Sequence, residues 1–256
     1  MKISAPALLI TFFLAALGCA QNAPAPSSEA QAAAVLRDTR AAAERGDAAA
    51  QQKLGMMYET GQGVTRDDAQ AVAWFRKSAE QGNAMGQASL AVMYLDGRGV
   101  AKDEAQAVAL YRKAANQGDP FAQTSLGVLY TRGQGVAQDD AQALAWCRQA
   151  AEQGYALAQG NLGWMYMQGR GVARDDAQAV AWFRKAAEQG LASFQSILGW
   201  MYEQGRGVAK DEVQAAAWYG KAAKQGNAEA KKRLASLEAR HPGITKTASQ
   251  AGKNNP

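Results

Sequence analysis

The spacing of apolar and polar residues along the chain indicates amphipathic helices. In residues 155–190, one set of side chains falls at helical spacing over about four turns and predicts a first helix. The set is Ala156, Gln159, Leu162, Gly163 and Tyr166. Gly169 and Gly171 follow, and because glycine adopts positive φ easily, they predict the end of this helix and a reversal of the chain.

A second helix is predicted after the reversal. Asp175 resembles an N-cap, and Gln178 stands three residues on, as in a D-x-x-Q form of the capping box. The expected apolar side of this helix consists of Ala177, Ala181, Trp182, Ala186 and Ala187, with Arg184, Lys185 and Glu188 outside. Gly190 ends the helix, so residues 155–190 predict a pair of helices joined by a short loop.

The same block occurs five times at a spacing of 36 residues. Its signature reads LGWMYMQGRGV from Leu162, and the other copies begin at Leu54, Leu90, Leu126 and Leu198. The repeats are 47–82, 83–118, 119–154, 155–190 and 191–226. A fixed period of this length indicates stacked repeats, so the chain is predicted to be an all-α solenoid whose core lies between neighbouring helix pairs.

Both ends of the array are predicted to be polar caps. In the capping helix of residues 30–46, Asp38 and Thr39 stand where the internal repeats carry an aromatic pair. In the capping helix of residues 227–240, Glu238 replaces the tyrosine of the repeat. Residues 241–256 lack any apolar period, so we expect this tail to be disordered.

The amino terminus predicts export. Residues 1–18 combine a basic start with an apolar run that is short for a membrane span, which is typical of a signal peptide. The end of this run, Ala15-Ala16-Leu17-Gly18-Cys19, resembles a bacterial lipoprotein signal, with Cys19 as the lipidated residue. Ordinary cleavage that releases a free protein is the alternative. Residues 19–29 read as a Pro/Ala/Ser tether, so we expect a periplasmic protein or outer-membrane lipoprotein, or a secreted one.

The charge distribution argues against nucleic acid. The net charge is +5, but residues 47–226 hold 18 Lys+Arg and 18 Asp+Glu, so the excess lies at the ends. A neutral body is a poor match for a phosphate backbone, and we expect no nucleic-acid partner. Contact with a membrane is expected only through a lipid on Cys19.

Catalytic and metal-binding patterns do not emerge from the sequence. His241 is the one histidine and lies in the tail, so no nucleophile–histidine arrangement can form around it. Five acidic pairs such as Asp175 and Asp176 stand at predicted helix starts, where caps and the helix dipole explain both carboxylates better than metal binding does. Cys147 is interpreted as a small core residue. We therefore predict no enzyme, cofactor or metal.

The repeated pattern resembles the Sel-1-like repeat family, relatives of the tetratricopeptide repeat. It is legible from Ala156 to Gly190 as A-x-x-x-L-G-x-M-Y-x-x-G-x-G-V-x-x-D-x-x-x-A-x-x-W-F-x-K-A-A-E-Q-G. The resemblance implies a right-handed α-solenoid that binds proteins or peptides as an adaptor. One branch of the family carries a disulfide in each repeat and has been linked to β-lactams. This chain departs from that branch because Cys147 is alone within the repeats.

A binding surface is expected at positions that differ between repeats. The first helix of each repeat supplies them, and the resemblance implies that this helix lines a concave groove. The predicted partner-binding residues are Phe121, Arg132, Leu157, Asn161, Trp164, Gln168, Ile197, Trp200 and Gln204. Trp164 and Trp200 are either recognition anchors or packing residues between helices. We expect a monomer that binds a protein or peptide; the alternatives are a glycan or peptidoglycan module and, third, a β-lactam-interacting enzyme.

Overall fold

The structure, a computed structural model, describes residues 28–251, and all regular secondary structure in this part of the chain is α-helix. The first helices of the five repeats are α2 (Ala48–Thr60), α4 (Ala84–Asp96), α6 (Pro120–Arg132), α8 (Ala156–Gln168) and α10 (Ala192–Gln204). The second helices are α3 (Asp68–Glu80), α5 (Glu104–Asn116), α7 (Asp140–Glu152), α9 (Asp176–Glu188) and α11 (Glu212–Lys224). The flanking helices are α1 (Ser28–Glu44), α12 (Ala228–Arg240) and α13 (Ile244–Ala251).

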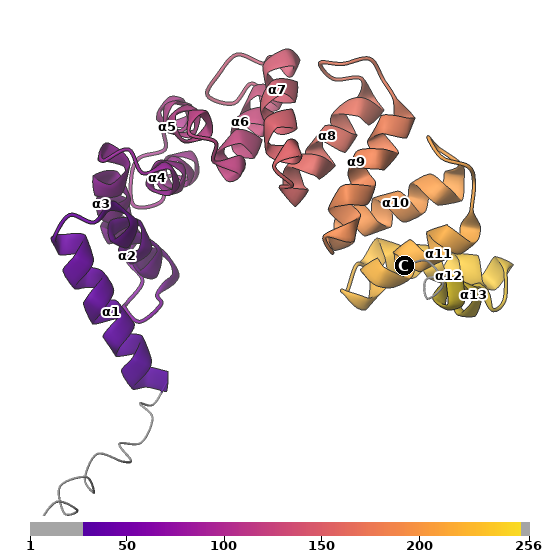
Figure 1. The fold of residues 1–256 in the computed structure, drawn as a ribbon, viewed down its shortest axis with the longest axis horizontal. Coiled ribbons are helices and arrows are strands. Elements are labelled where there is room, and N and C mark those ends of the chain that lie inside the picture. Colours follow the sequence, from indigo (N-terminus) through magenta and orange to yellow (C-terminus); the bar gives the residue numbers. More distant parts are fainter. Residues whose placement is uncertain (1–27, 252–256) are drawn as a thin grey trace, which may run out of the picture.

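The helices form an arch (Figure 1), with α1 at one end and α11 to α13 at the other. Each first helix packs on the second helix of its own repeat and on that of the repeat before it. The first helices also approach one another, α2 with α4 and α6 with α8, whereas no two second helices come together to the same extent in residues 28–251. The first helices therefore line the inner side of the arch, and the predicted all-α solenoid is confirmed.

A glycine and a ring interlock inside repeats 1, 4 and 5. In repeat 4, Leu162 and Phe183 are fully buried, and a Cβ added to Gly163 would lie only 2.8 Å from the Phe183 ring. Because glycine has no Cβ, the ring can enter the space between the two helices. In repeat 3, the same place is taken by Cys147, as the sequence predicted, and this thiol is also buried.

The buried side of the second helix differs from the one predicted. Ala177 and Ala181 are exposed. The buried residues of α9 are Ala179, Val180, Phe183, Ala186 and Ala187. Phe183 sets this face, because residues three and four positions away from an inward ring also turn inward on a helix. Small side chains do not by themselves identify the buried face, because alanine occurs on both the buried and the exposed side of α9.

Both ends differ from an internal repeat. Arg40 of α1 donates to the Tyr58 hydroxyl at 3.4 Å, just as Arg184 donates to Tyr202 four repeats further on, so α1 takes the place of a second helix. Thr39 is buried where an aromatic ring would otherwise stand, while Asp38 is exposed. The predicted polar cap thus begins at Ser28, two residues earlier than expected.

The tail prediction was wrong for residues 244–251, which form α13. Ile244 and Ala248, four residues apart, are buried against α11. Glu238 holds the start of this helix, because its carboxylate accepts from Gly243 N at 2.8 Å and Thr245 N at 3.1 Å. One apolar pair over two turns was too short a period to detect, and the role of Glu238 as a capping acceptor explains why it replaces the repeat tyrosine.

The predicted signal peptide, Cys19 and nearly all of the tether lie outside the described residues. Within residues 28–251, no helix combines the length and the apolar character needed to cross a bilayer.

Candidate binding surface

Glutamine side chains tie each repeat to the next. Gln159 on α8 is buried, and its Nε2 donates to the carbonyl oxygen of Ala151 at 3.3 Å. Its Oε1 accepts from Gln189 Nε2 at 2.8 Å. The same glutamine pairs are Gln81–Gln51, Gln117–Gln87, Gln153–Gln123 and Gln225–Gln195. Because both ends of each buried amide are satisfied, these pairs fix the spacing of neighbouring helices.

The two acidic residues of each pair have different hydrogen-bond partners. Asp175 caps α9, accepting from Gln178 N at 2.9 Å, as predicted. Asp176 instead accepts from Arg206, which reaches back from the next loop, at 3.0 and 3.1 Å. Hydrogen bonds from Arg174 and then Arg206 lower the pKa of Asp176 to about 2. The interpretation of both carboxylates as caps or dipole partners was therefore incomplete for the second one.

This arginine–acid contact, here called the loop lock, recurs along the array. The equivalent pairs are Arg98–Asp68, Gln134–Glu104 and Arg170–Asp140. The sequence carried a signal for the contact, because the middle position of every G-x-G loop is Arg or Gln, and in the last four loops an acid lies 30 residues earlier. The lock holds each loop against the start of the preceding second helix.

Glycine makes the close approach in the loop lock possible. Gly171 has φ +67°, and an added Cβ would collide with the carbonyl oxygen of Asp140. Gly63, at the same place in the first repeat, has φ +75°, but its Cβ would meet only the end of Met57 at 3.6 Å. The first repeat therefore lacks the tight contact, and the residue 30 positions before Gln62 is Ala32, where the other loops have an acid.

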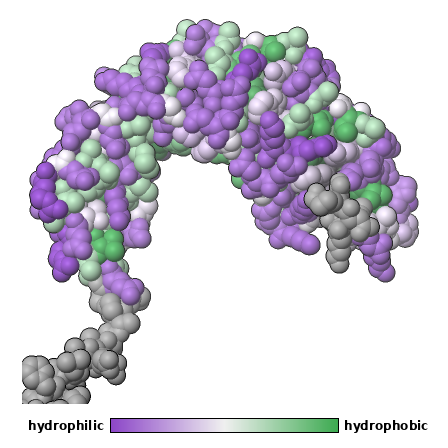
Figure 2. Space-filling model, viewed as in Figure 1, coloured by the Kyte–Doolittle hydropathy of each residue, from purple (hydrophilic) through white to green (hydrophobic). Residues whose placement is uncertain are grey.

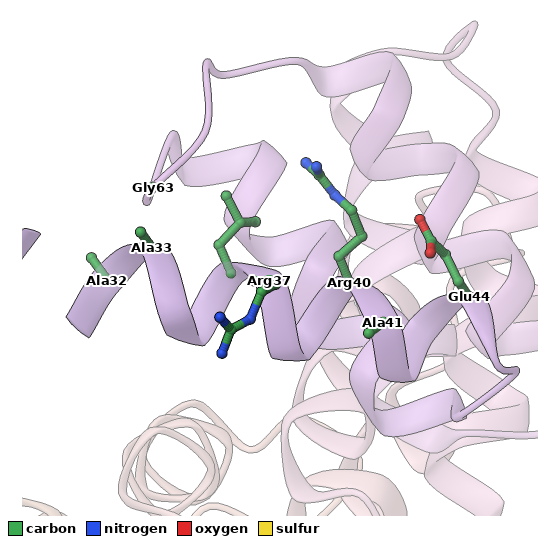
Figure 3. A pocket seen from close by; sticks show the side chains of 8 residues that line it. Ala32, Ala33, Arg37, Arg40, Ala41, Glu44 and Gly63 are labelled. Carbon is green, nitrogen blue, oxygen red and sulfur yellow. The ribbon is translucent and has the colours of Figure 1, made fainter. Parts of the chain in front are cut away.

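A shallow hollow of about 560 Å³ opens at this unlocked junction. Figure 3 shows Ala33, Arg40 and Glu44 along α1 with Gly63 across from them. The hollow lies between α1 and the first G-x-G loop, and none of the variable residues of the inner surface lines it. It is a feature of the end of the array.

The inner surface consists of one exposed stripe on each first helix. On α6 the stripe runs from Phe121 in the first turn, through Val128, to Arg132 in the last turn. We name three rows across the arch by their residues. The apolar edge is Met85, Phe121 and Leu157; the floor is Val92, Val128 and Trp164; the polar edge is Asp96, Arg132 and Gln168.

The predicted site residues all lie on this inner stripe, with different exposure. Phe121 is 41% exposed, Leu157 47% and Trp164 37%. Arg132, Gln168 and Gln204 are exposed, whereas Asn161, Ile197 and Trp200 are half-buried. Met85, at 57%, is the most exposed large apolar side chain in residues 31–250, and it was left out of the predicted set. Met85 lies one repeat before Phe121, and this position was the signal by which the sequence could have added it to the predicted binding residues.

The two tryptophans are not equivalent. Trp164 packs edge-on against Phe183 with ring centroids 5.5 Å apart, and Phe183 stacks on Phe194 at 6.0 Å. Trp164 therefore both packs and remains open to a ligand. The guanidinium of Arg206 lies 5.4 Å from the ring centroid of Trp200, so part of that ring faces the loop lock. Figure 2 shows mainly hydrophilic residues on the visible face, with hydrophobic ones in small groups.

Candidate reactive groups are few in the described residues. Burial raises the pKa of the Cys147 thiol to about 12, so little thiolate exists at neutral pH. His241 Nε2 lies 2.6 Å from Glu212 Oε2 at the end of the array. No cluster of three or more His, Cys, Asp or Glu residues that could hold a metal ion occurs in residues 28–251.

The comparison with protein families agrees with the periodicity. The family model described as Sel1 repeat matches residues 48–83, 84–119, 120–155, 156–191 and 192–227. The chain belongs to the Sel1 repeat family. Sel1 repeat proteins are commonly protein-interaction scaffolds and are generally non-catalytic. The matched units begin one residue later than the repeats counted from the sequence.

Solved Sel1 repeat structures resemble this chain closely. A protective antigen of uropathogenic Escherichia coli is 39% identical, with a TM-score of 0.76 over 86% of this chain and 49% of that one. A Sel1 repeat protein from Oxalobacter formigenes is 40% identical, with a TM-score of 0.73 over 79% of this chain and 59% of that one. The chain thus spans about half of these relatives. No curated protein matches it.

Proposed function

We propose that this Sel1 repeat protein is a non-catalytic adaptor that binds a protein or peptide on the inner surface of the arch. The observation that carries the proposal is the division of each first helix into fixed and variable sides. The fixed side holds buried residues such as Gln159 and Leu162, whereas the variable side exposes Met85, Phe121 and Leu157. Apolar side chains left open at one position in successive repeats are typical of a recognition surface.

Export is part of the same proposal. It rests on the leader and on Cys19, which resembles the lipidated cysteine of bacterial lipoproteins. The adaptor would then act in the periplasm or at the outer membrane, or as a secreted protein. Export is tested separately, by fractionation of cells and by comparing the mass of the mature protein with that of Cys19→Ser.

Glycan binding is the second candidate, and Trp164 favours it because an exposed indole can stack on a sugar ring. Two neighbouring tryptophans would make a stronger sugar platform, but Trp200 is half-buried with Arg206 over its ring. This arrangement leaves one open indole beside the apolar edge. The apolar edge therefore favours a polypeptide over a glycan.

The proposal is tested by selecting displayed random peptides on the purified protein. Selected peptides should lose binding to Leu157→Ser and keep binding to Ala181→Ser, which alters an exposed alanine on a second helix. Equal binding to both variants would refute the inner surface as the site. Sedimentation with peptidoglycan that is lost in Trp164→Ala, with no peptides selected, would favour the glycan function. Nitrocefin turnover by the pure protein would instead indicate an enzyme.

A further inference from the structure

The inner surface has chemically distinct edges. Met85, Phe121 and Leu157 of the apolar edge lie in the first turns of α4, α6 and α8, with exposures between 41 and 57%. The polar edge lies 11 residues further along the same helices, which is about 16 Å at 1.5 Å per residue. An α-helix with its side chains is about 10–12 Å wide, so one helix can lie on the floor between the two edges.

The repeat spacing suits a helix that crosses the first helices. Among the first helices, α2 packs on α4 and α6 packs on α8. Packed helices lie roughly 8–10 Å apart, and we take about that distance as the advance of the apolar edge in each repeat. Two turns of an α-helix advance about 10.5 Å over seven residues. A β-strand returns to the same face every two residues, about 6.6 Å or 13 Å apart, and fits this spacing less well. On a partner helix, apolar residues seven positions apart would therefore contact the apolar edge of successive repeats.

The polar edge carries an ordered pair of charges. Asp96 and Arg132 stand at the same position of successive repeats and are exposed. Neither belongs to an ion pair within residues 28–251, whereas the acids of the loop locks do. Gln168 follows at the third position and is uncharged. A helix lying on the floor would therefore face a negative and then a positive charge along one flank.

We propose that the polypeptide bound by this surface is an amphipathic α-helix whose charges complement this order. The helix lies across α4, α6 and α8 with its apolar stripe toward Met85, Phe121 and Leu157. On the flank facing the polar edge it places a basic residue beside Asp96 and an acidic residue, two turns on, beside Arg132. This inference rests on the proposed function of the inner surface, and the charge order determines which helices bind and in which direction.

The test uses displayed 21-residue helices and the full protein. Leucine occupies an apolar stripe, and two positions on each flank, seven residues apart, vary among Lys, Glu and Gln. The wild type should enrich one Lys and one Glu on a single flank in one order. The double variant Asp96→Arg, Arg132→Asp, which keeps the net charge, should enrich the reverse order. Each winning peptide should bind its own protein about tenfold more tightly than the other, since exposed ion pairs contribute modestly.

Different outcomes separate this inference from the proposed function. If winning peptides lose binding to Phe121→Ser but show the same charge order on wild type and double variant, the charge inference is wrong and the inner surface stands. If a proline in the middle of a winning peptide leaves its binding intact, the bound form is not a helix. If Phe121→Ser binds as tightly as wild type, the inner surface itself is wrong.

Discussion

The substitution Gly171→Ala tests how the loops join neighbouring repeats, and Gly63→Ala is its matched control. Both glycines occupy the same place in a G-x-G loop and have nearly the same φ, +67° and +75°. An added methyl group collides with the Asp140 carbonyl oxygen at Gly171, but at Gly63 it makes only an ordinary contact with the end of Met57 at 3.6 Å. The pair therefore separates the cost of a positive φ from the cost of breaking the contact between repeats.

The expected magnitudes follow from the contacts. Alanine at positive φ costs about 1 kcal/mol at either position. At Gly171, relief of the collision also moves Arg170 away from Asp140, at 2.8 and 3.2 Å, and from the Thr131 carbonyl oxygen at 2.9 Å. These side chains are about 30% exposed, so we assign roughly 1 kcal/mol to each partner lost. Gly171→Ala should therefore lose about 3 kcal/mol and Gly63→Ala about 1 kcal/mol.

Urea unfolding followed by circular dichroism measures both losses. With a slope of about 2 kcal/mol per molar urea, the midpoint should fall by about 1.5 M for Gly171→Ala and 0.5 M for Gly63→Ala. Because repeat arrays can unfold in steps, hydrogen exchange at the start of α7 provides a local measure. Equal midpoints, with unchanged exchange in α7, would refute the loop lock as a stabilising contact.

Three further outcomes are expected. Because the pKa of Asp176 is lowered to about 2, its contribution is fully present above about pH 4 and is lost as the pH falls through 2; Asp176→Asn should cost about 1 kcal/mol in urea unfolding at pH 7 and almost nothing at pH 2. Cys147, whose pKa is raised by burial, should react with a thiol reagent only as fast as the array opens, and rapid labelling of the native protein would contradict its burial. Glu238→Ala should speed hydrogen exchange in α13 but not in α7, and unchanged exchange in α13 would show that the cap contributes nothing.

The fold was predictable because the same helix and loop signals occur in every repeat of the sequence. Leu162 and the G-x-G loop recur in five copies, so a helical period that is ambiguous in one copy becomes decisive. Asp175 as a cap follows from the same local signals. The tail offered no repetition, and α13 depends on Ile244 and Ala248 meeting α11, which only the three-dimensional arrangement reveals.

Sequence reasoning selected positions for the candidate site, but the exposure of each side chain there came only from the structure. The variable positions of the first helices do lie on the inner stripe, yet exposure distinguishes Trp164 from Trp200 through contacts with Phe183 and Arg206. The spacing of 30 residues between Asp176 and Arg206 is visible in the sequence, but periodicity alone does not show that the two side chains touch. Contacts between repeats are tertiary contacts, which local propensity does not determine.

Photo-cross-linking in living cells tests the central claim, binding at the inner surface, most directly. Photoreactive residues replace Arg132 and Gln168 on the polar edge, and Ala181 on α9 serves as the outer control. The account predicts that one discrete protein is captured from both inner positions and not from Ala181, and that Phe121→Ser abolishes this capture. Equal labelling from the inner and outer positions, or capture that survives Phe121→Ser, would contradict it.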